Sequence, residues 1–301
     1  MRPLVVIPTY NEAENIERML QRVEECLPEA GVLVVDDGSP DGTAELVAAA
    51  AGRYRDVHLL RRNEKSGLGS AYRAGFGWGL ERGYDAFVEM DCDFSHDPAA
   101  LPGLVAPIAE GYDVVIGSRY VEGGSIPNWA WHRELLSRGG NLYAAAVLGL
   151  GVRDSTAGFR CYSASILQRL DLRHIRAEGY GFQIEMTYRS KQCGAAITEV
   201  PISFVDRAAG ESKMSSYIVV EALGLVTWWG LGRLVAPVRR LSRGQKRGGA
   251  GAGPGAGGVA TPGRNGSAAS SASNVAARSN GASTSSDPDS DSGEADERSV
   301  R

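Results

Sequence analysis

Short apolar runs alternate with amphipathic segments along the first part of the chain. Runs typical of buried strands lie at residues 4–7, 32–35, 57–60, 86–90 and 114–116. Segments with helical spacing of apolar residues lie between them, at 15–26, 43–51 and 69–82. Strands that alternate with helices predict a parallel sheet with helices on both faces. We therefore expect an α/β fold with a Rossmann-like, mainly parallel sheet.

Polar clusters follow three of these strands. They are Pro8-Thr9-Tyr10-Asn11-Glu12, Asp36-Asp37 and Asp91-Cys92-Asp93. A lone Asp after a strand often caps a helix, and an acid in a first helical turn complements the helix dipole. However, the carboxyl ends of parallel strands meet at one edge of a sheet, so we expect the three clusters to converge. Their carboxylates would repel one another unless a cation and a polar ligand sit among them.

The aspartates at 91 and 93 are one residue apart at the end of a strand, so their side chains point the same way. Carboxylate oxygens suit hard cations such as Mg²⁺ or Mn²⁺, whereas the thiol of Cys92 is a poor ligand for them. An acid after the second strand commonly binds the ribose or base of a nucleoside. We interpret this edge as a nucleotide site with a metal on the phosphates; two solvated turn aspartates are the alternative.

A glycine pair after the third strand, Gly67 and Gly69, imitates a dinucleotide fingerprint. It follows the wrong strand and lacks the third glycine at the right offset, so the match is weak. We interpret it as a loop that leads into a helix N-terminus, close enough to touch a phosphate.

Composition divides the chain near residue 238. From there to residue 301 no Phe, Trp or Tyr occurs and Gly, Ala and Ser dominate, so we expect residues 1–237 to fold and residues 239–301 to form a basic, then low-complexity, disordered tail. The net charge of -4 argues against a nucleic-acid binder. The four cysteines are scattered, as expected for reduced thiols. The N-terminal apolar run at 4–7 is too short for a signal peptide.

Residues 217–238 are mostly apolar and about long enough to span a bilayer, which takes roughly 20 residues. The run contains Glu221 and Arg233, and a basic cluster follows it. A helix that lies on the membrane, with the basic residues on anionic headgroups, fits this pattern better than a span. Trp228 and Trp229 suit such an interface, and a core helix of the domain is the alternative.

Four motifs together resemble glycosyltransferase family 2 with the GT-A fold. They are PTYNE at 8–12, VDDGSPDGT at 35–43, D-x-D at 91–93 and GSRY at 117–120. The segment RAAGESK at 207–213 makes the chain similar, within that family, to the enzymes that mannosylate dolichyl and other polyprenyl phosphates. The likeness runs from about residue 3 to residue 214, which is nearly the whole expected folded part.

The resemblance implies an inverting transfer of mannose from GDP-mannose to a polyprenyl monophosphate by a peripheral enzyme at the cytoplasmic face of a membrane. It implies catalytic roles for Asp91, Asp93 and Arg119. It implies a donor site formed by Pro8, Tyr10, Glu12, Val35, Asp37, Asp91, Cys92, Asp93, Arg119, Arg207 and Lys213. The implied acceptor-phosphate residues are Arg119, Lys213 and, as a weaker candidate that requires its loop to fold inward, Arg133. The implied metal ligands are Asp91, Asp93 and Ser95, which stands where some relatives carry Gln.

The implied chemistry agrees with the residue types. Arg binds phosphate through a planar fork and Lys as a point charge. The acceptor phosphate has a second pKa of about 6, so it is already an anion and needs little help from a general base. Two alternatives are an enzyme that uses another donor, such as UDP-glucose, and a non-catalytic subunit that binds a nucleotide sugar. A separate membrane-anchoring protein stays open as a partner. In GYGFQIEMTYRS we expect Phe182, Ile184 and Met186 in the core, and Gln183 and Glu185 receive no role.

Overall fold

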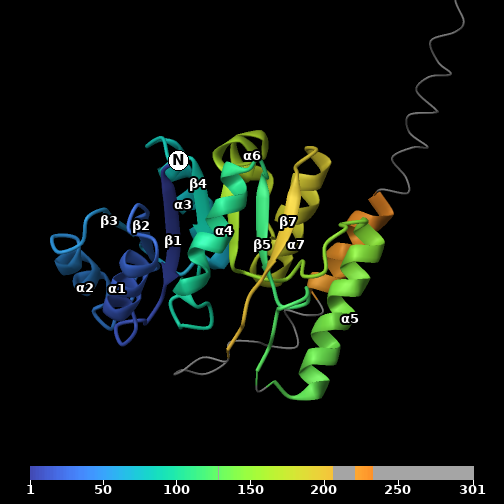
Figure 1. Cartoon of the computed structure of the whole chain (residues 1–301), viewed down its shortest axis with the longest axis horizontal. Helices are drawn as coiled ribbons and strands as arrows, with labels where there is room; N and C mark the ends of the chain where they lie inside the picture. The colour runs from blue at the N-terminus through green and yellow to red at the C-terminus, as the bar shows by residue number, and fades with distance from the viewer. Residues whose placement is uncertain (128, 206–220, 233–301) are drawn as a thin grey trace, which may run out of the picture. The chain divides into compact units, whose positions relative to one another are not determined.

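In a computed structural model the described part of the chain comprises residues 1–127, 129–205 and 221–232 (Figure 1). The predicted ligands Arg207 and Lys213, and the whole predicted tail at 239–301, lie outside the described residues.

A single sheet organises the described residues, in the strand order β3-β2-β1-β4-β6-β5-β7. The strands are β1 (Pro3–Thr9), β2 (Gly31–Asp36), β3 (Val57–Arg61), β4 (Ala86–Glu89), β5 (Val114–Ser118), β6 (Arg160–Ser163) and β7 (Ile197–Pro201). β6 runs antiparallel to both of its neighbours, and the other pairs are parallel. The predicted mainly parallel sheet is confirmed, with one inserted antiparallel strand.

Helices cover both faces of the sheet, as predicted (Figure 1). One face carries α1 (Ile16–Cys26), α2 (Thr43–Ala50) and α4 (Leu101–Ala109), with the short 3-10 helix η1 (Pro98–Ala100). The other carries α3 (Leu68–Leu80), α6 (Ala164–Arg169) and α7 (Gly179–Gln192), with η2 (Leu172–His174). Along β1 successive side chains enter opposite cores, Leu4 and Val6 facing α3 while Val5 and Ile7 face α1. Both faces are therefore buried, which is why these strands are continuously apolar.

Two helices extend the core on the α3, α6 and α7 face beyond the sheet. They are α5 (Trp131–Leu148) and the helix at residues 221–232, which lie side by side (Figure 1). The hydroxyls of Tyr143 and Thr227 are 2.7 Å apart across this contact. Ala222 and Val226 are buried against the core, whereas Trp228 on the same helix is 74% exposed. The described part of the predicted 217–238 segment thus has one face in the core and one outside it.

None of the helices in the described ranges has the length and apolar character needed to span a bilayer.

Candidate active site

A cavity of about 650 Å³ opens at the carboxyl edge of the sheet. The three polar clusters do converge there, together with the segments that follow β5 and precede β6. The predicted residues in its wall are Pro8, Tyr10, Glu12, Asp37, Asp91, Cys92, Asp93, Ser95, Arg119 and Arg133. The sheet topology accounts for the meeting of the three clusters, which are far apart in the sequence.

Among the predicted donor residues that the structure describes, Val35 is the exception. Its side chain is fully buried in the core beneath α3, close to Gly75, and does not line the cavity. The alternation along β2 sends the Val35 side chain into the core, so only the backbone of Val35 remains for the predicted contact with the donor, and that contact stays a prediction.

The acids after β2 have protein partners of their own. Asp37 accepts two hydrogen bonds from Arg62, from Nε at 2.6 Å and from Nη2 at 2.9 Å. Asp36 accepts from the backbone N–H of Ser39 at 3.1 Å. The repulsion expected among the carboxylates is therefore relieved in part by Arg62, before any ligand binds. Asp37 also lines the cavity, and a carboxylate can accept more hydrogen bonds than the two from Arg62.

Asp91 and Asp93 follow β4 in a tight turn. Phe94 lies in the left-handed region with φ of 60°, which lets the Ser95 N–H donate to Asp93 Oδ1 at 3.0 Å. Asp93 is buried, and Asp91 is partly exposed to the cavity. Within the described residues no three His, Cys, Asp or Glu side chains lie close enough to hold a metal. Two hard carboxylates fit a divalent cation that takes its other ligands from a bound diphosphate and water.

His96 is a buried neighbour of this pair that the sequence analysis did not single out. Its Nδ1 accepts the backbone N–H of Asp91 at 3.2 Å, and its ring stacks on Phe159 at 4.8 Å between centroids. Burial lowers the pKa of His96, so the ring is neutral with its proton on Nε2. Its position directly after D-x-D-F-S was the only signal in the sequence.

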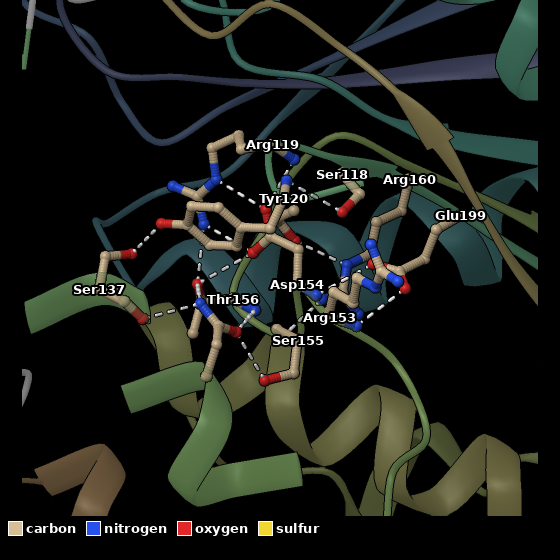
Figure 2. A network of polar contacts seen from close by, with 12 residues as sticks. Ser118, Arg119, Tyr120, Ser137, Arg153, Asp154, Ser155, Thr156, Arg160 and Glu199 are labelled. Atoms are coloured by element: carbon tan, nitrogen blue, oxygen red, sulfur yellow. Dashed lines mark hydrogen bonds and ion pairs between the residues drawn. The ribbon is translucent and has the colours of Figure 1, made fainter. Parts of the chain in front are cut away.

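Arg119 follows β5 and is held by a buried carboxylate (Figure 2). Asp154 accepts from the Arg119 backbone N–H at 3.0 Å, from Nε at 2.7 Å and from Nη2 at 2.7 Å. Nη2 also donates to Thr156 Oγ1 at 2.8 Å. Glu199 in turn accepts the backbone N–H groups of Arg153 and Asp154, at 2.8 and 2.9 Å. This chain of contacts fixes the guanidinium in the cavity wall.

A second guanidinium lies against the same part of the wall. Arg133 stacks over the Trp129 indole with its Cζ 3.9 Å from the ring centroid. The Cζ of Arg119 is 5.7 Å from the same centroid. The segment that carries Arg133 is thus folded inward, the condition that its candidacy required. Two cations against one ring form a site suited to an anion.

Several other wall residues were missed or left without a role. They are Lys65, Trp129, Thr156, Glu178, Tyr180 and Gln183. Gln183 donates from Nε2 to Glu89 at 2.7 Å, and burial raises the pKa of Glu89 to about 8. Phe182, Ile184 and Met186 lie in the core, as predicted. Such residues carry no motif, and only the folded chain brings them to the cavity.

The loop at Gly67 leads into the N-terminus of α3, as predicted, and Gly67 and Leu68 line the cavity. The carboxylate of Glu178 accepts the Gly69 N–H at 2.7 Å and pairs with Arg73 at 3.1 Å. The N-terminus of α3 is therefore capped by an acid of the protein itself, and the expected contact of this loop with a phosphate stays a prediction.

Comparison with known proteins gives a consistent result. Residues 4–171 match the model of glycosyl transferase family 2. The undecaprenyl-phosphate mannosyltransferase of Micrococcus luteus is 52% identical over 231 residues, covering 77% of this chain and 95% of that protein. The polyprenol monophosphomannose synthase of Mycolicibacterium smegmatis is 48% identical over 235 residues, covering 77% of this chain and 89% of that protein.

A solved structure shares the fold at much lower identity. Glucosyl-3-phosphoglycerate synthase from Mycobacterium tuberculosis in complex with phosphoglyceric acid superimposes with a TM-score of 0.57 at 22% identity, covering 75% of this chain and 78% of that chain. The expected GT-A architecture is thereby confirmed. The family match covers more than half of the chain, and the two curated relatives each match 77% of it. The chain belongs to glycosyltransferase family 2.

Proposed function

We propose that this glycosyltransferase moves mannose from GDP-mannose to the phosphate of a polyprenyl monophosphate, with inversion at the anomeric carbon. The observation that carries the proposal is one cavity with a carboxylate pair, Asp91 and Asp93, and two guanidiniums, Arg119 and Arg133. The names of the Micrococcus and Mycolicibacterium relatives, at 52% and 48% identity, support mannose as the sugar and a polyprenyl phosphate as the acceptor.

The donor end of the cavity suits a nucleoside diphosphate. Asp37 offers acceptor oxygens for ribose or base hydroxyl and N–H groups, and Pro8, Tyr10 and Glu12 form the adjacent wall. Asp91 and Asp93, with Ser95 as a further candidate, would hold the Mg²⁺ or Mn²⁺ ion, and such an ion neutralises charge on a departing diphosphate. Arg207 and Lys213, outside the described residues, are proposed as further phosphate ligands.

The acceptor end needs cations more than it needs a base. A phosphate monoester is already an anion at neutral pH, since its second pKa is about 6. Arg119 and Arg133 can orient such an anion for attack on the anomeric carbon, and Asp154 keeps the first of them rigid. The transition state resembles an oxocarbenium ion, as in other glycosyl transfers, and no side chain has to remove a proton.

We further propose that the enzyme is peripheral, at the cytoplasmic face of a membrane. Most of the exposed large apolar side chains of the described part lie on two adjacent helices, α5 and residues 221–232; they are Trp131, Leu135, Leu136, Leu142, Tyr143, Leu223, Trp228 and Leu231. An apolar surface of this kind suits contact with lipid. The four cysteines are free, as is usual in a reducing compartment.

The direct test offers GDP-mannose and UDP-glucose in parallel to the purified protein, with a polyprenyl phosphate and Mg²⁺, and detects the glycosylated lipid by mass spectrometry. We expect mannosyl product from GDP-mannose alone, and none after EDTA. Glucosyl product would overturn the donor assignment and keep the acceptor. Absence of any product with donor binding intact would overturn the proposed reaction.

A further inference from the structure

A buried amide group lies in the wall of the active-site cavity. Gln183, on α7, lines the cavity although the residue is only 2% exposed. Its Nε2 donates to Glu89 Oε2 at 2.7 Å, but its Oε1 is buried and has no hydrogen-bond partner among the residues that the structure describes. Buried polar atoms in folded proteins are nearly always paired, so an unpaired one in a cavity wall indicates a place for a ligand.

The amide is held in place by two fully buried charged residues. Glu89 on β4 and Arg160 on β6 are directly opposite each other in the sheet. Arg160 Nη1 donates to the backbone carbonyl of Gln183 at 2.9 Å, while Glu89 accepts from the side chain. Glu89 Oε2 can accept that N–H whether the carboxyl group is ionised or protonated on its other oxygen. Contacts in the core therefore fix the amide before any substrate binds.

Gln183 adjoins both halves of the catalytic arrangement. A Cβ placed on Gly158 would lie 3.9 Å from Gln183 Nε2 and 3.7 Å from the ring of His96, which contacts the turn that carries the carboxylate pair. Two residues before Gly158, Thr156 accepts from the guanidinium of Arg119. In a glycosyl transfer the sugar lies between the departing and the attacking group. The amide is thus placed where the sugar is expected.

The unpaired atom also selects the sugar among the substrate groups. The amide oxygen needs a donor, whereas ionised phosphate oxygens only accept and a hydrocarbon chain does neither. The nucleoside has donors of its own, but these are expected at Asp37. A sugar hydroxyl both donates and accepts, so it can pair with the amide in either orientation of the group.

We propose that the side chain of Gln183 forms a hydrogen bond with a hydroxyl group of the transferred sugar and thereby contributes to the choice of sugar. The inference rests on the proposed function and adds a specificity-determining residue to it. Glu89 and Arg160 act behind the amide as positioning residues. A sugar whose hydroxyl points elsewhere leaves the buried amide oxygen unpaired, and a site of this kind discriminates strongly against such a sugar.

Two buried positions of α7 offer a matched pair for the test. Gln183→Met keeps an unbranched side chain of similar length and removes both polar atoms of the amide. Thr187→Val is the control, because Thr187 is fully buried and contacts the same network but does not line the cavity. Its hydroxyl donates to the Gln183 carbonyl at 2.9 Å and accepts from Arg160 at 2.7 Å.

The measurement is calorimetric binding of GDP and of GDP-mannose, with Mg²⁺ and without acceptor. Gln183→Met should lower the ratio of the affinity for GDP-mannose to that for GDP by roughly 3- to 10-fold, as expected for one lost hydrogen bond, with the affinity for GDP unchanged. Thr187→Val should leave this ratio at the wild-type value. Equal changes in both variants, or none in Gln183→Met, would overturn the inference and leave Gln183 with a structural role or a water as its partner.

Analogues of GDP-mannose that each lack one sugar hydroxyl identify the group that Gln183 contacts. One of them should bind the wild type roughly 3- to 10-fold more weakly than GDP-mannose does, and should bind Gln183→Met as well as GDP-mannose does. Losses that are the same in wild type and Gln183→Met for every analogue would contradict the contact.

A second variant covers the event that Gln183→Met does not fold. Gln183→Asn keeps an amide but shortens the side chain by one methylene group, so it should show the same loss of affinity for the sugar. Binding of UDP-glucose in place of GDP-mannose, with the ratio of UDP-glucose to UDP affinity lowered in these variants, would keep the contact and overturn the proposed donor instead.

Discussion

Replacement of Asp154 by asparagine tests whether the buried ion pair with Arg119 supports both the fold and the site. Asp154 is 0% exposed and Arg119 is 5% exposed. The side chain of Arg119 donates two hydrogen bonds of 2.7 Å to the carboxylate. Asparagine has nearly the same shape, but it removes the negative charge and places an amide donor opposite a guanidinium donor.

The expected cost follows from this geometry. Each hydrogen bond to a charged group contributes about 1.5–3 kcal/mol, and removal of one partner from a buried ion pair costs about 3–5 kcal/mol. We therefore expect Asp154→Asn to lower the free energy of unfolding by about 3–5 kcal/mol. Glu45→Gln is the control, since its pair with Arg61 is exposed and such pairs contribute about 0.2–1 kcal/mol.

Urea unfolding, with the slope m compared between variants, measures this difference. Turnover should also fall, because Arg119 loses the partner that orients it, and Glu45→Gln should leave turnover unchanged. A loss of stability below about 1 kcal/mol in Asp154→Asn, with Arg119 still required for activity, would refute the reasoning.

The ion pair of Asp154 and Arg119 also predicts how the free energy of unfolding depends on pH. Burial raises the pKa of Asp154, but the hydrogen bonds and charge of Arg119 outweigh it and hold the pKa below its usual value. A depressed pKa contributes stability that is complete above the unfolded pKa, about 3.9, and is lost as pH falls below it. The free energy of unfolding of the wild type should therefore fall more than that of Asp154→Asn when the pH is lowered from about 5 to about 3.

Three further predictions concern the metal pair and the core. Asp93→Ala should lower turnover by at least about 100-fold with little change in the unfolding midpoint. A variant that keeps its activity would show that Asp93 is not part of the active site. Gly79→Ala should destabilise by about 1–3 kcal/mol because its Cβ would lie 2.5 Å from Leu4 and Phe87, whereas Gly77→Ala, in open space on the same helix, should stabilise slightly. Phe76→Ala should cost about 3–5 kcal/mol, measured by thermal unfolding, since the ring is fully buried.

Strands and helices whose apolar residues recur at the spacing of that element could be predicted from the sequence. The strand expected at 4–7 is observed as β1 (Pro3–Thr9), longer because Pro8 and Thr9 still pair with Val35 and Asp36. The helix expected at 15–26 is α1, with Ile16, Leu20 and Val23 on its buried face. In each case the local pattern and the tertiary packing agree.

β6 could not be predicted in this way, because it begins with a charged residue. Arg160 is fully buried, and its guanidinium donates to the carbonyl oxygens of Ser155, Ala157 and Gln183 at 2.6, 2.6 and 2.9 Å. These acceptors come from a preceding loop and from α7, so no local pattern reveals them. A buried arginine with these partners is stable only in the completed fold.

The candidate site likewise contains residues that the sequence reveals and residues that only the folded chain reveals. Asp91 and Asp93 are separated by a single residue in the sequence and could be recognised there. Asp154 lies 35 residues from Arg119, and the contact between them depends on the antiparallel pairing of β6 with β5. The inward position of Arg133 depends on Trp129, which a charge pattern does not reveal.

The antiparallel direction of β6 affects how the preferences for donor and for acceptor can change between related enzymes. The chain leaves the sheet at the carboxyl end of β5 and re-enters it at the start of β6, on the same edge. The segment between them, which includes Arg133, Asp154 and α5, is a single insertion between neighbouring strands. The donor wall comes mainly from earlier segments. We expect exchange of residues 120–159 between family members, which leaves the shared residue Arg119 in place, to change acceptor preference more than donor preference.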